Sequence, residues 1–144
     1  MTNTRPARQA PHAVVRAFMT RHSVDEQQLR SDGRLTLTVE NRYRLHLQSA
    51  PLNRVAISAQ VLDLSGRLED AATTRLLEAL MNRATGMLQQ YPSTLSIDAR
   101  TEALLLQHTL AGDVDASAFE EELGSFVSAL KFWHRLGSTE ALRA

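Results

Sequence analysis

The amino-acid sequence predicts an α+β domain in which an antiparallel sheet packs with helices. Three consecutive segments alternate apolar and polar residues with a period of two, as strands covered on one face do. Three other segments place apolar residues every three or four positions, as amphipathic helices do. The expected order is α-β-β-β-α-β-β-α, and 144 residues suffice for a single domain.

The first expected element is a short helix from Ala13 to His22, with Val15, Phe18 and Met19 on one side. The preceding residues 1–12 are polar and are expected to form a flexible tail. They resemble neither a secretory signal nor a membrane anchor, and no segment has the length of a membrane span.

A polar connection ending in the turn signal Asp32-Gly33 leads to three expected strands, at 35–40, 43–48 and 55–61. Asn41-Arg42 separates the first two, and Asn tolerates the left-handed conformation of a tight hairpin. Each strand has one apolar and one polar face. The sequence therefore predicts an antiparallel meander.

The second expected helix runs from about Glu69 to Leu88, and its apolar side is broad enough to contact two neighbours. A short fourth strand is expected at Leu95 and Ile97. The fifth, Ala103 to Leu110, is apolar on both faces, which indicates a central strand or one beneath a partner.

The last expected helix begins with a capping box formed by Ser117 and Glu120, and Gly137 stands where a helix stop belongs. The domain is accordingly expected over residues 13–137, with a flexible tail at 138–144. Apolar residues at an alternating four-three spacing form one stripe along this helix: Phe119, Leu123, Phe126, Leu130 and Trp133.

The net charge of zero conceals an asymmetry. Residues 1–60 contain nine arginines against four carboxylates, whereas the remainder contains seven basic and twelve acidic residues. The arginines are scattered, and no recognition helix or stacking strand accompanies them, so nucleic-acid binding is disfavoured. Two solvated faces of opposite charge, which help a dimer or partner to orient, are the simpler interpretation.

Candidate chemistry is sparse. The chain has no cysteine, no phosphate-binding glycine loop and no nucleophile elbow, so no catalytic residue, metal site or cofactor is predicted. His108 lies on the leucine face of the fifth strand and is expected to be a core residue that donates to a backbone carbonyl. Glu120, Glu121 and Glu122 are expected to stabilise the positive end of a helix dipole.

Apolar surface is the remaining feature. Each apolar stripe alone is explained by a core, but the broad second helix and the two-sided fifth strand together indicate self-association. A symmetric two-fold dimer is the commonest arrangement.

At this level the residues resemble the class I type III secretion chaperones of Gram-negative bacteria, the family that includes the Tir chaperone. The resemblance covers Ala13 to Leu136. The motifs that carry it are, in order, Leu35-Thr-Leu-Thr-Val39, Tyr43-Arg-Leu-His-Leu47, Val61-Leu-Asp-Leu64, Leu76-Leu-Glu-Ala-Leu80-Met-Asn82, Leu95-Ser-Ile-Asp98, Ala103-Leu-Leu-Leu106, and Phe126-Val127 with Trp133.

The resemblance implies a cytoplasmic bacterial homodimer without enzymatic activity, which holds the N-terminal non-globular segment of a cognate effector and delivers it to the secretion machinery. The secretion ATPase is a candidate further partner, and neither nucleic acid nor a membrane is implied. The implied effector-binding groove comprises Val14, Val15, Phe18, Met19, Leu35, Leu37, Leu45 and Leu47. The implied dimer contact comprises Leu77, Leu80, Met81, Ala84 and Leu105.

These chaperones are typically acidic, whereas this chain is neutral with a basic N-terminal half, which is compatible with an effector segment of acidic character. Two alternatives stay open beside the chaperone. One is a peptide-binding or regulatory module with the same fold and no secretion role. The other is an enzyme with an unrecognised site, for which His46, His108 and Glu121 would be tested. Whether the apolar residues of the first helix form groove or core is also open.

Overall fold

In the computed structural model, the described residues form three α-helices and a five-stranded antiparallel sheet, as the sequence predicts, together with one turn of 3-10 helix. The structure describes residues 10–90 and 92–143, with side chains up to Thr139. The expected tail at 1–12 thus lies outside the described residues up to position 9. The elements are α1 (Ala13–Arg21), a turn of 3-10 helix η1 (Glu26–Gln28), β1 (Leu35–Val39), β2 (Tyr43–Ala50), β3 (Arg54–Asp63), α2 (Ala71–Gly86), β4 (Thr94–Asp98), β5 (Ala103–Ala111) and α3 (Ala116–Arg143).

The strands are hydrogen-bonded in the order β1-β2-β3-β5-β4, so β1 and β4 are the edge strands. The chain forms two compact units. Unit 1 comprises the residues up to Ile57 together with Thr109–Glu120, and unit 2 comprises Ser58–His108 together with the chain from Glu121 onward. The elements β3, β5 and α3 each continue from one unit into the other.

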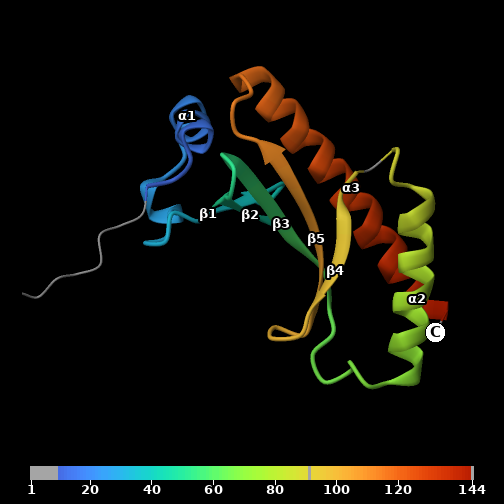
Figure 1. The fold of residues 1–144 in the computed structure, drawn as a ribbon. Helices are drawn as coiled ribbons and strands as arrows, with labels where there is room; N and C mark the ends of the chain where they lie inside the picture. Colours follow the sequence, from blue (N-terminus) through green and yellow to red (C-terminus); the bar gives the residue numbers. More distant parts are fainter. Residues whose placement is uncertain (1–9, 91, 144) are drawn as a thin grey trace, which may run out of the picture. The chain divides into compact units, whose positions relative to one another are not determined.

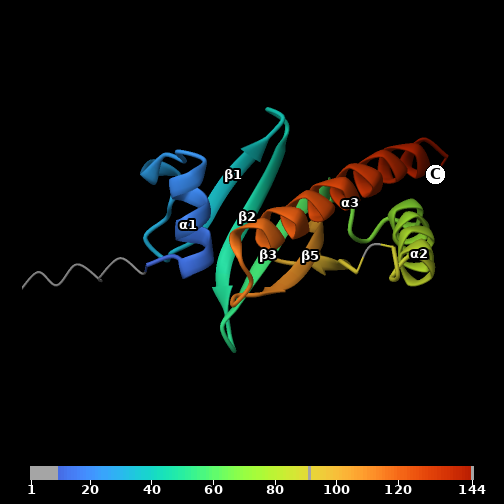
Figure 2. The ribbon, with the colours of Figure 1, turned by 90° about the horizontal axis from the view of Figure 1, so that it is seen from above.

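Unit 1 contains α1 and the β1–β2 hairpin, which lie side by side (Figures 1 and 2). Leu35 pairs with Leu47 and Leu37 with Leu45, so the four leucines share one face of the hairpin, and all four are buried. The hairpin turn differs slightly from the expected one. Glu40 and Asn41, rather than Asn41 and Arg42, have positive φ values of 55° each.

The core of unit 2 includes side chains of β3, α2, β5 and the greater part of α3. Leu80 of α2, Leu104 and Leu106 of β5, and Trp133 of α3 are at most 2% exposed. The indole Nε1 of Trp133 has no hydrogen-bond partner among the described residues. The strand β4 pairs with β5 in register, with Leu95 opposite Leu106 and Ile97 opposite Leu104.

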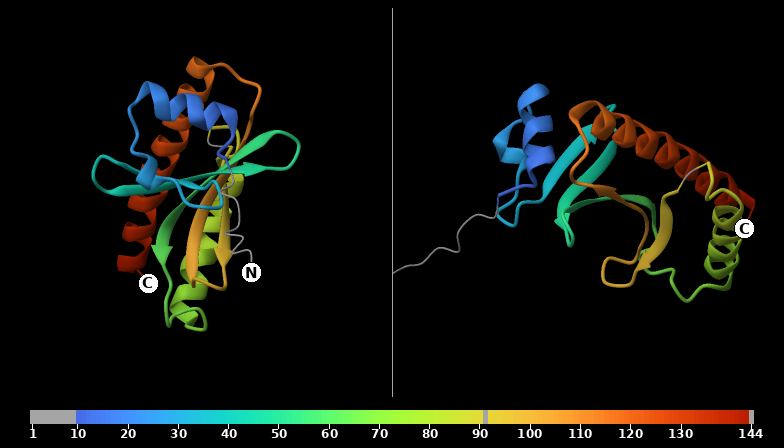
Figure 3. Two further views of the ribbon diagram at one scale, coloured as in Figure 1. Left: turned by 90° about the vertical axis from the view of Figure 1, so that its left-hand side faces the viewer. Right: turned by 45° about the horizontal axis from the view of Figure 1, so that its top comes forward.

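Both expected ends of the last helix are wrong. The helix begins at Ala116, because Asp115 caps it by accepting a hydrogen bond from the backbone N–H of Ala118 at 2.8 Å. It does not stop at Gly137 but continues to Arg143, so residues 138–143 are helical rather than a tail (Figure 3). Gly137 is buried, and a Cβ there would lie 3.2 Å from a Leu62 methyl group, so this glycine allows the helix to approach β3 closely.

Candidate functional site

The eight apolar residues that were expected to line a groove come together in unit 1. All eight are buried: Val15, Leu35, Leu45 and Leu47 are at most 1% exposed, and the other four at most 9%. Phe18 packs against the rings of His22 and Phe119, at centroid distances of 4.6 Å and 5.8 Å. In the single chain these side chains, including those of the first helix, form a core and not an open groove.

Polar interactions fix α1 at its N-terminal end. Nδ1 of His12 accepts a hydrogen bond from the backbone N–H of Val14 at 3.1 Å, which caps the helix. Because a nitrogen that accepts is unprotonated, Nε2 of the neutral ring carries the hydrogen and donates to Oδ1 of Asn53 at 2.6 Å. The backbone N–H of Gly112 donates to the carbonyl oxygen of Asn53 at 2.8 Å. His12 thus connects α1 to the β2–β3 turn, and the backbone of Asn53 connects that turn to the segment after β5.

Two carboxylates fix the rest of α1. Arg16 forms an ion pair with Glu26 of η1. At the end of the helix, Nε2 of His22 contacts Oε1 of Glu120 on α3, and Nη2 of Arg21 lies 3.6 Å from the same oxygen. The hydrogen bond with His22, with the charge of Arg21, holds the pKa of Glu120 below its ordinary value. The expected role of Glu120 at the helix dipole is therefore supplemented by a contact between elements that sequence spacing does not reveal.

The open edge of β1 offers backbone groups to another chain. On the open side of β1, Leu29 forms an antiparallel backbone bridge with Leu35, at the beginning of the strand. Beyond Leu35 the edge runs along Thr36 to Val39, and an edge strand presents unpaired N–H and C=O groups there.

The residues expected at a dimer contact differ in exposure. Leu77, Met81 and Ala84 of α2 and Leu105 of β5 are partly exposed. Leu80 is fully buried within unit 2, so a second chain cannot touch its side chain without displacing α2. Sequence reasoning missed two exposed apolar residues of the same unit. These are Leu88, at 49% exposure, and Ile97 on the edge strand β4, at 45%.

His108 lies in a small pocket of unit 2 and is not the fully buried core residue expected. Its Nε2 is 3.5 Å from Oε2 of Glu122, and its side chain is 18% exposed. The pocket of about 130 Å³ is lined by Gln90, Pro92, Ser93, His108, Glu122, Ser125, Phe126, Ser128 and Ala129. Pockets for drug-sized ligands typically reach about 300–1,000 Å³, so this one has the size for a single side chain.

Comparison with known proteins decides the family. The model of the Tir chaperone protein (CesT) family matches residues 13–134. The chain belongs to this family. The resemblance predicted from the sequence is thereby confirmed, and with it the assignment to the type III secretion chaperones. No curated protein matches the chain.

Several solved structures share the fold of this family member. The crystal structure of the ExsC-ExsE complex matches with a TM-score of 0.63 and 18% identity, over 87% of this chain and 91% of that one. The HopA1-SchA chaperone-effector complex matches with a TM-score of 0.60 and 12% identity, over 83% and 88%. The Yersinia pestis type III secretion chaperone SycH, in complex with a stable fragment of YscM2, matches with a TM-score of 0.58 and 15% identity, over 85% and 98%.

No helix among residues 10–90 and 92–143 is long and apolar enough to cross a membrane. Within the same described part of the chain, no group of three or more His, Asp or Glu side chains is arranged to hold a metal ion.

Proposed function

We propose that this chaperone binds the N-terminal non-globular segment of a cognate effector in the bacterial cytoplasm and keeps it competent for secretion, without enzymatic activity or a cofactor. The observation that carries the proposal is the family match over residues 13–134. The secretion ATPase is the proposed receiver of the loaded chaperone. Solved relatives of the fold include a chaperone-effector complex, which supports an effector as partner.

The effector segment adds to the sheet at the open edge of β1. An extended peptide there gains main-chain hydrogen bonds, and its alternate side chains pack beside the apolar face of the strand. Leu37 is the neighbour that those side chains meet, because cross-strand neighbours on one face lie about 5 Å apart and Leu35 already has Leu29 opposite it. The other residues of the expected groove support this edge from beneath, and a larger contact with them requires α1 to move.

The chaperone acts as a two-fold dimer through α2 and β5. The partly exposed side chains of Leu77, Met81, Ala84 and Leu105 form the proposed contact, with Leu80 supporting it from within the protomer. Leu88 and Ile97 extend the apolar surface of this unit, as expected of a surface that a second subunit covers.

Co-expression tests the proposal. The chaperone is produced with the N-terminal segment of each candidate effector encoded in the same genome, and complexes are isolated by affinity and size-exclusion chromatography. We expect one segment to co-purify, and deletion of the chaperone to abolish secretion of that effector. A stable complex whose loss leaves secretion unchanged would instead identify a regulatory module with the chaperone fold.

A further inference from the structure

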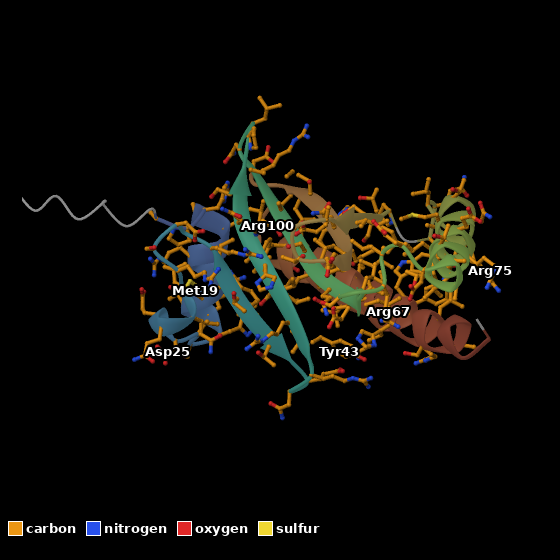
Figure 4. The ribbon with its side chains drawn as sticks, turned by 90° about the horizontal axis from the view of Figure 1, so that it is seen from below. Met19, Asp25, Tyr43, Arg67, Arg75 and Arg100 are labelled. Carbon is orange, nitrogen blue, oxygen red and sulfur yellow. The ribbon has the colours of Figure 1, made fainter. Side chains whose placement is uncertain are left out.

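One face of the β1–β2 hairpin carries positive charge. Thr36 and Thr38 of β1 lie opposite His46 and Arg44 of β2, on the face that points away from the buried leucines. Arg34 precedes Thr36 by two positions and therefore continues the same face. Figure 4 shows both strands from below, with α1 beside them and not in front of them.

A third arginine belongs to this face. Arg30 lies in the turn before β1, where its backbone N–H donates to the carbonyl oxygen of Arg34 at 2.8 Å. We call Arg30, Arg34, Arg44 and His46 the basic face. The arginine ion pairs that the structure shows lie outside this face and join Arg16 to Glu26 and Arg21 to Glu120. Asp32, in the same turn, accepts from the backbone N–H of Arg34 at 3.0 Å.

The arginines of the basic face contribute to a lowered pKa of His46. Burial, followed by the charges of Arg34, Arg30 and Arg44, holds the pKa of His46 below 6.5. At neutral pH the ring is therefore uncharged, and its Nδ1 lies 3.0 Å from the hydroxyl of Thr36. The three arginine charges disfavour a positive charge on His46. The same charges favour a negatively charged group bound at this face.

The position of the basic face beside an edge strand indicates the form of the anion. A peptide strand added to β1 would place every second side chain on the basic face and the others on the apolar face. Carboxylates at the first set of positions would lie beside Thr36 and Thr38, with the positive charges of Arg34 and Arg44 nearby, and apolar side chains at the second set would lie beside the leucine face. A nucleic acid fits less well, because tight binding to single strands uses several stacking rings, and the hairpin has one, Tyr43, already beneath Arg42 at 5.3 Å.

We propose that the basic face recognises an acidic, extended segment of the bound protein in which Asp or Glu alternates with apolar residues. This inference rests on the proposed function, because the segment is taken to be part of the effector that adds to β1. It assigns the polar face of the hairpin a role in selecting the partner, whereas the apolar layer and the strand edge accept many sequences.

Labelled peptides that alternate Val with Glu, Val with Lys, or Val with Gln test the charge requirement by fluorescence anisotropy with the full chain. We expect the Val-Glu peptide to bind tightest and to weaken as salt rises above about 0.1 M, where the screening length falls below about 10 Å. The double variant Arg34→Glu with Arg44→Glu should lose roughly tenfold or more in affinity for it. The matched control, Arg100→Glu with Arg135→Glu, changes the net charge equally at exposed sites in unit 2 and should bind as the wild type does.

A second readout is the titration of His46 by NMR. Bound carboxylates offset the field of the arginines, so the pKa of His46 should rise when the Val-Glu peptide is added. Equal binding of the Val-Glu peptide by the double variant and the wild type would overturn the inference, as would tighter binding of the Val-Lys peptide. Preferential capture of poly-uridine by the basic face would assign it to nucleic acid. A change in oligomeric mass in the double variant would assign it to self-association.

Retention of the native effector by the wild type and by the double variant distinguishes this inference from the proposed function. If the wild type and the double variant retain the effector equally, the basic face is not the selector, and the chaperone function stands. If the wild type retains no effector, the proposed function fails, and the peptide series still decides what the basic face binds.

Discussion

Nε2 of His12 lies 2.6 Å from Oδ1 of Asn53, a residue 41 positions later in the sequence. The same ring caps α1 through its Nδ1, so one neutral histidine begins a helix and holds a β-turn at the same time. The turn is itself strained, because Leu52 and Asn53 have φ values of 63° and 55°. His12 thus couples the start of α1 to a turn that has two residues in the left-handed region.

Replacing His12 should loosen unit 1. His12→Ala removes the helix cap and the bond to Asn53, and we expect a loss of about 1–2 kcal/mol in the free energy of unfolding, measured with urea. His12→Asn keeps a capping side chain and should recover part of the loss. Equal stability of His12→Ala and the wild type would show that the bonds to this ring contribute nothing.

The backbone of Gly112 lies very close to His12 and to the β2–β3 turn. A Cβ there would lie 2.3 Å from both the carbonyl oxygen of Asn53 and Nε2 of His12. Gly112→Ala must therefore displace both atoms or shift its own backbone, and we expect a loss of about 1–3 kcal/mol in the free energy of unfolding. Gly124→Ala is the matched control, because nothing lies within 4 Å of its added Cβ and alanine favours the helix, for a gain of about 0.5–1 kcal/mol. Thermal unfolding of the two variants should shift in opposite directions.

The contact between His22 and Glu120 predicts an acid-sensitive unit 1. Since the pKa of Glu120 is lowered in the folded chain, its contribution to stability is present above the ordinary value of 4.5 and is lost as the pH falls through the folded-state pKa. Glu120→Gln should remove this part of the pH dependence below 4.5. Glu121→Gln, an exposed neighbour, should keep it. Urea unfolding of all three proteins over the acid range is the measurement, and coincident pH profiles would refute the assignment.

Charge on α2 should separate core from dimer contact. Leu80→Asp buries a carboxylate without a partner, so we expect unfolding, seen as loss of helical circular dichroism. Leu77→Asp and Met81→Asp alter partly exposed side chains and should give folded monomers by light scattering. If both folded variants keep the mass of the wild type, α2 is not the dimer contact.

Substitutions of Phe18 test whether the buried apolar residues of α1 form a core or an effector-binding groove. The side chain is 9% exposed and contacts Phe119, so Phe18→Glu should unfold unit 1. Phe18→Leu keeps an apolar side chain and should fold with a moderate loss of stability. Retained folding with weakened effector binding in Phe18→Glu would instead show that a groove opens beneath α1.

Periodicity was sufficient for the sheet. Apolar alternation predicted the face shared by Leu35 and Leu47, because burial of one face determines the strand register. It could not predict that the apolar side of α1 is buried within the single chain, since a stripe on a helix looks the same whether a partner or its own chain buries it. Periodicity also could not predict where α3 ends. Gly137 resembles a helix stop in the sequence, and the proximity of Leu62 that explains it exists only in the fold.

The histidine contacts were unpredictable for a related reason. His22 and Glu120 are separated by 98 positions, and no local spacing reports such a pair. The sequence does not distinguish Asp115 as the cap, because Ser117 with Glu120 matches the capping-box pattern equally well. The exposure of Leu88 and Ile97 depends on which side of each element the fold leaves open, which apolar character alone does not determine.

The place of Trp133 makes the two halves of the chain distinguishable by optical spectroscopy. It is the single tryptophan of the sequence and lies 2% exposed in unit 2. Its emission should be blue-shifted and should move to longer wavelength when unit 2 opens, because the buried indole then meets water. Circular dichroism follows the helices of both units. A variant in which unit 1 unfolds first, such as Gly112→Ala, should therefore lose ellipticity before its fluorescence changes. Both signals can be measured on one sample during thermal unfolding.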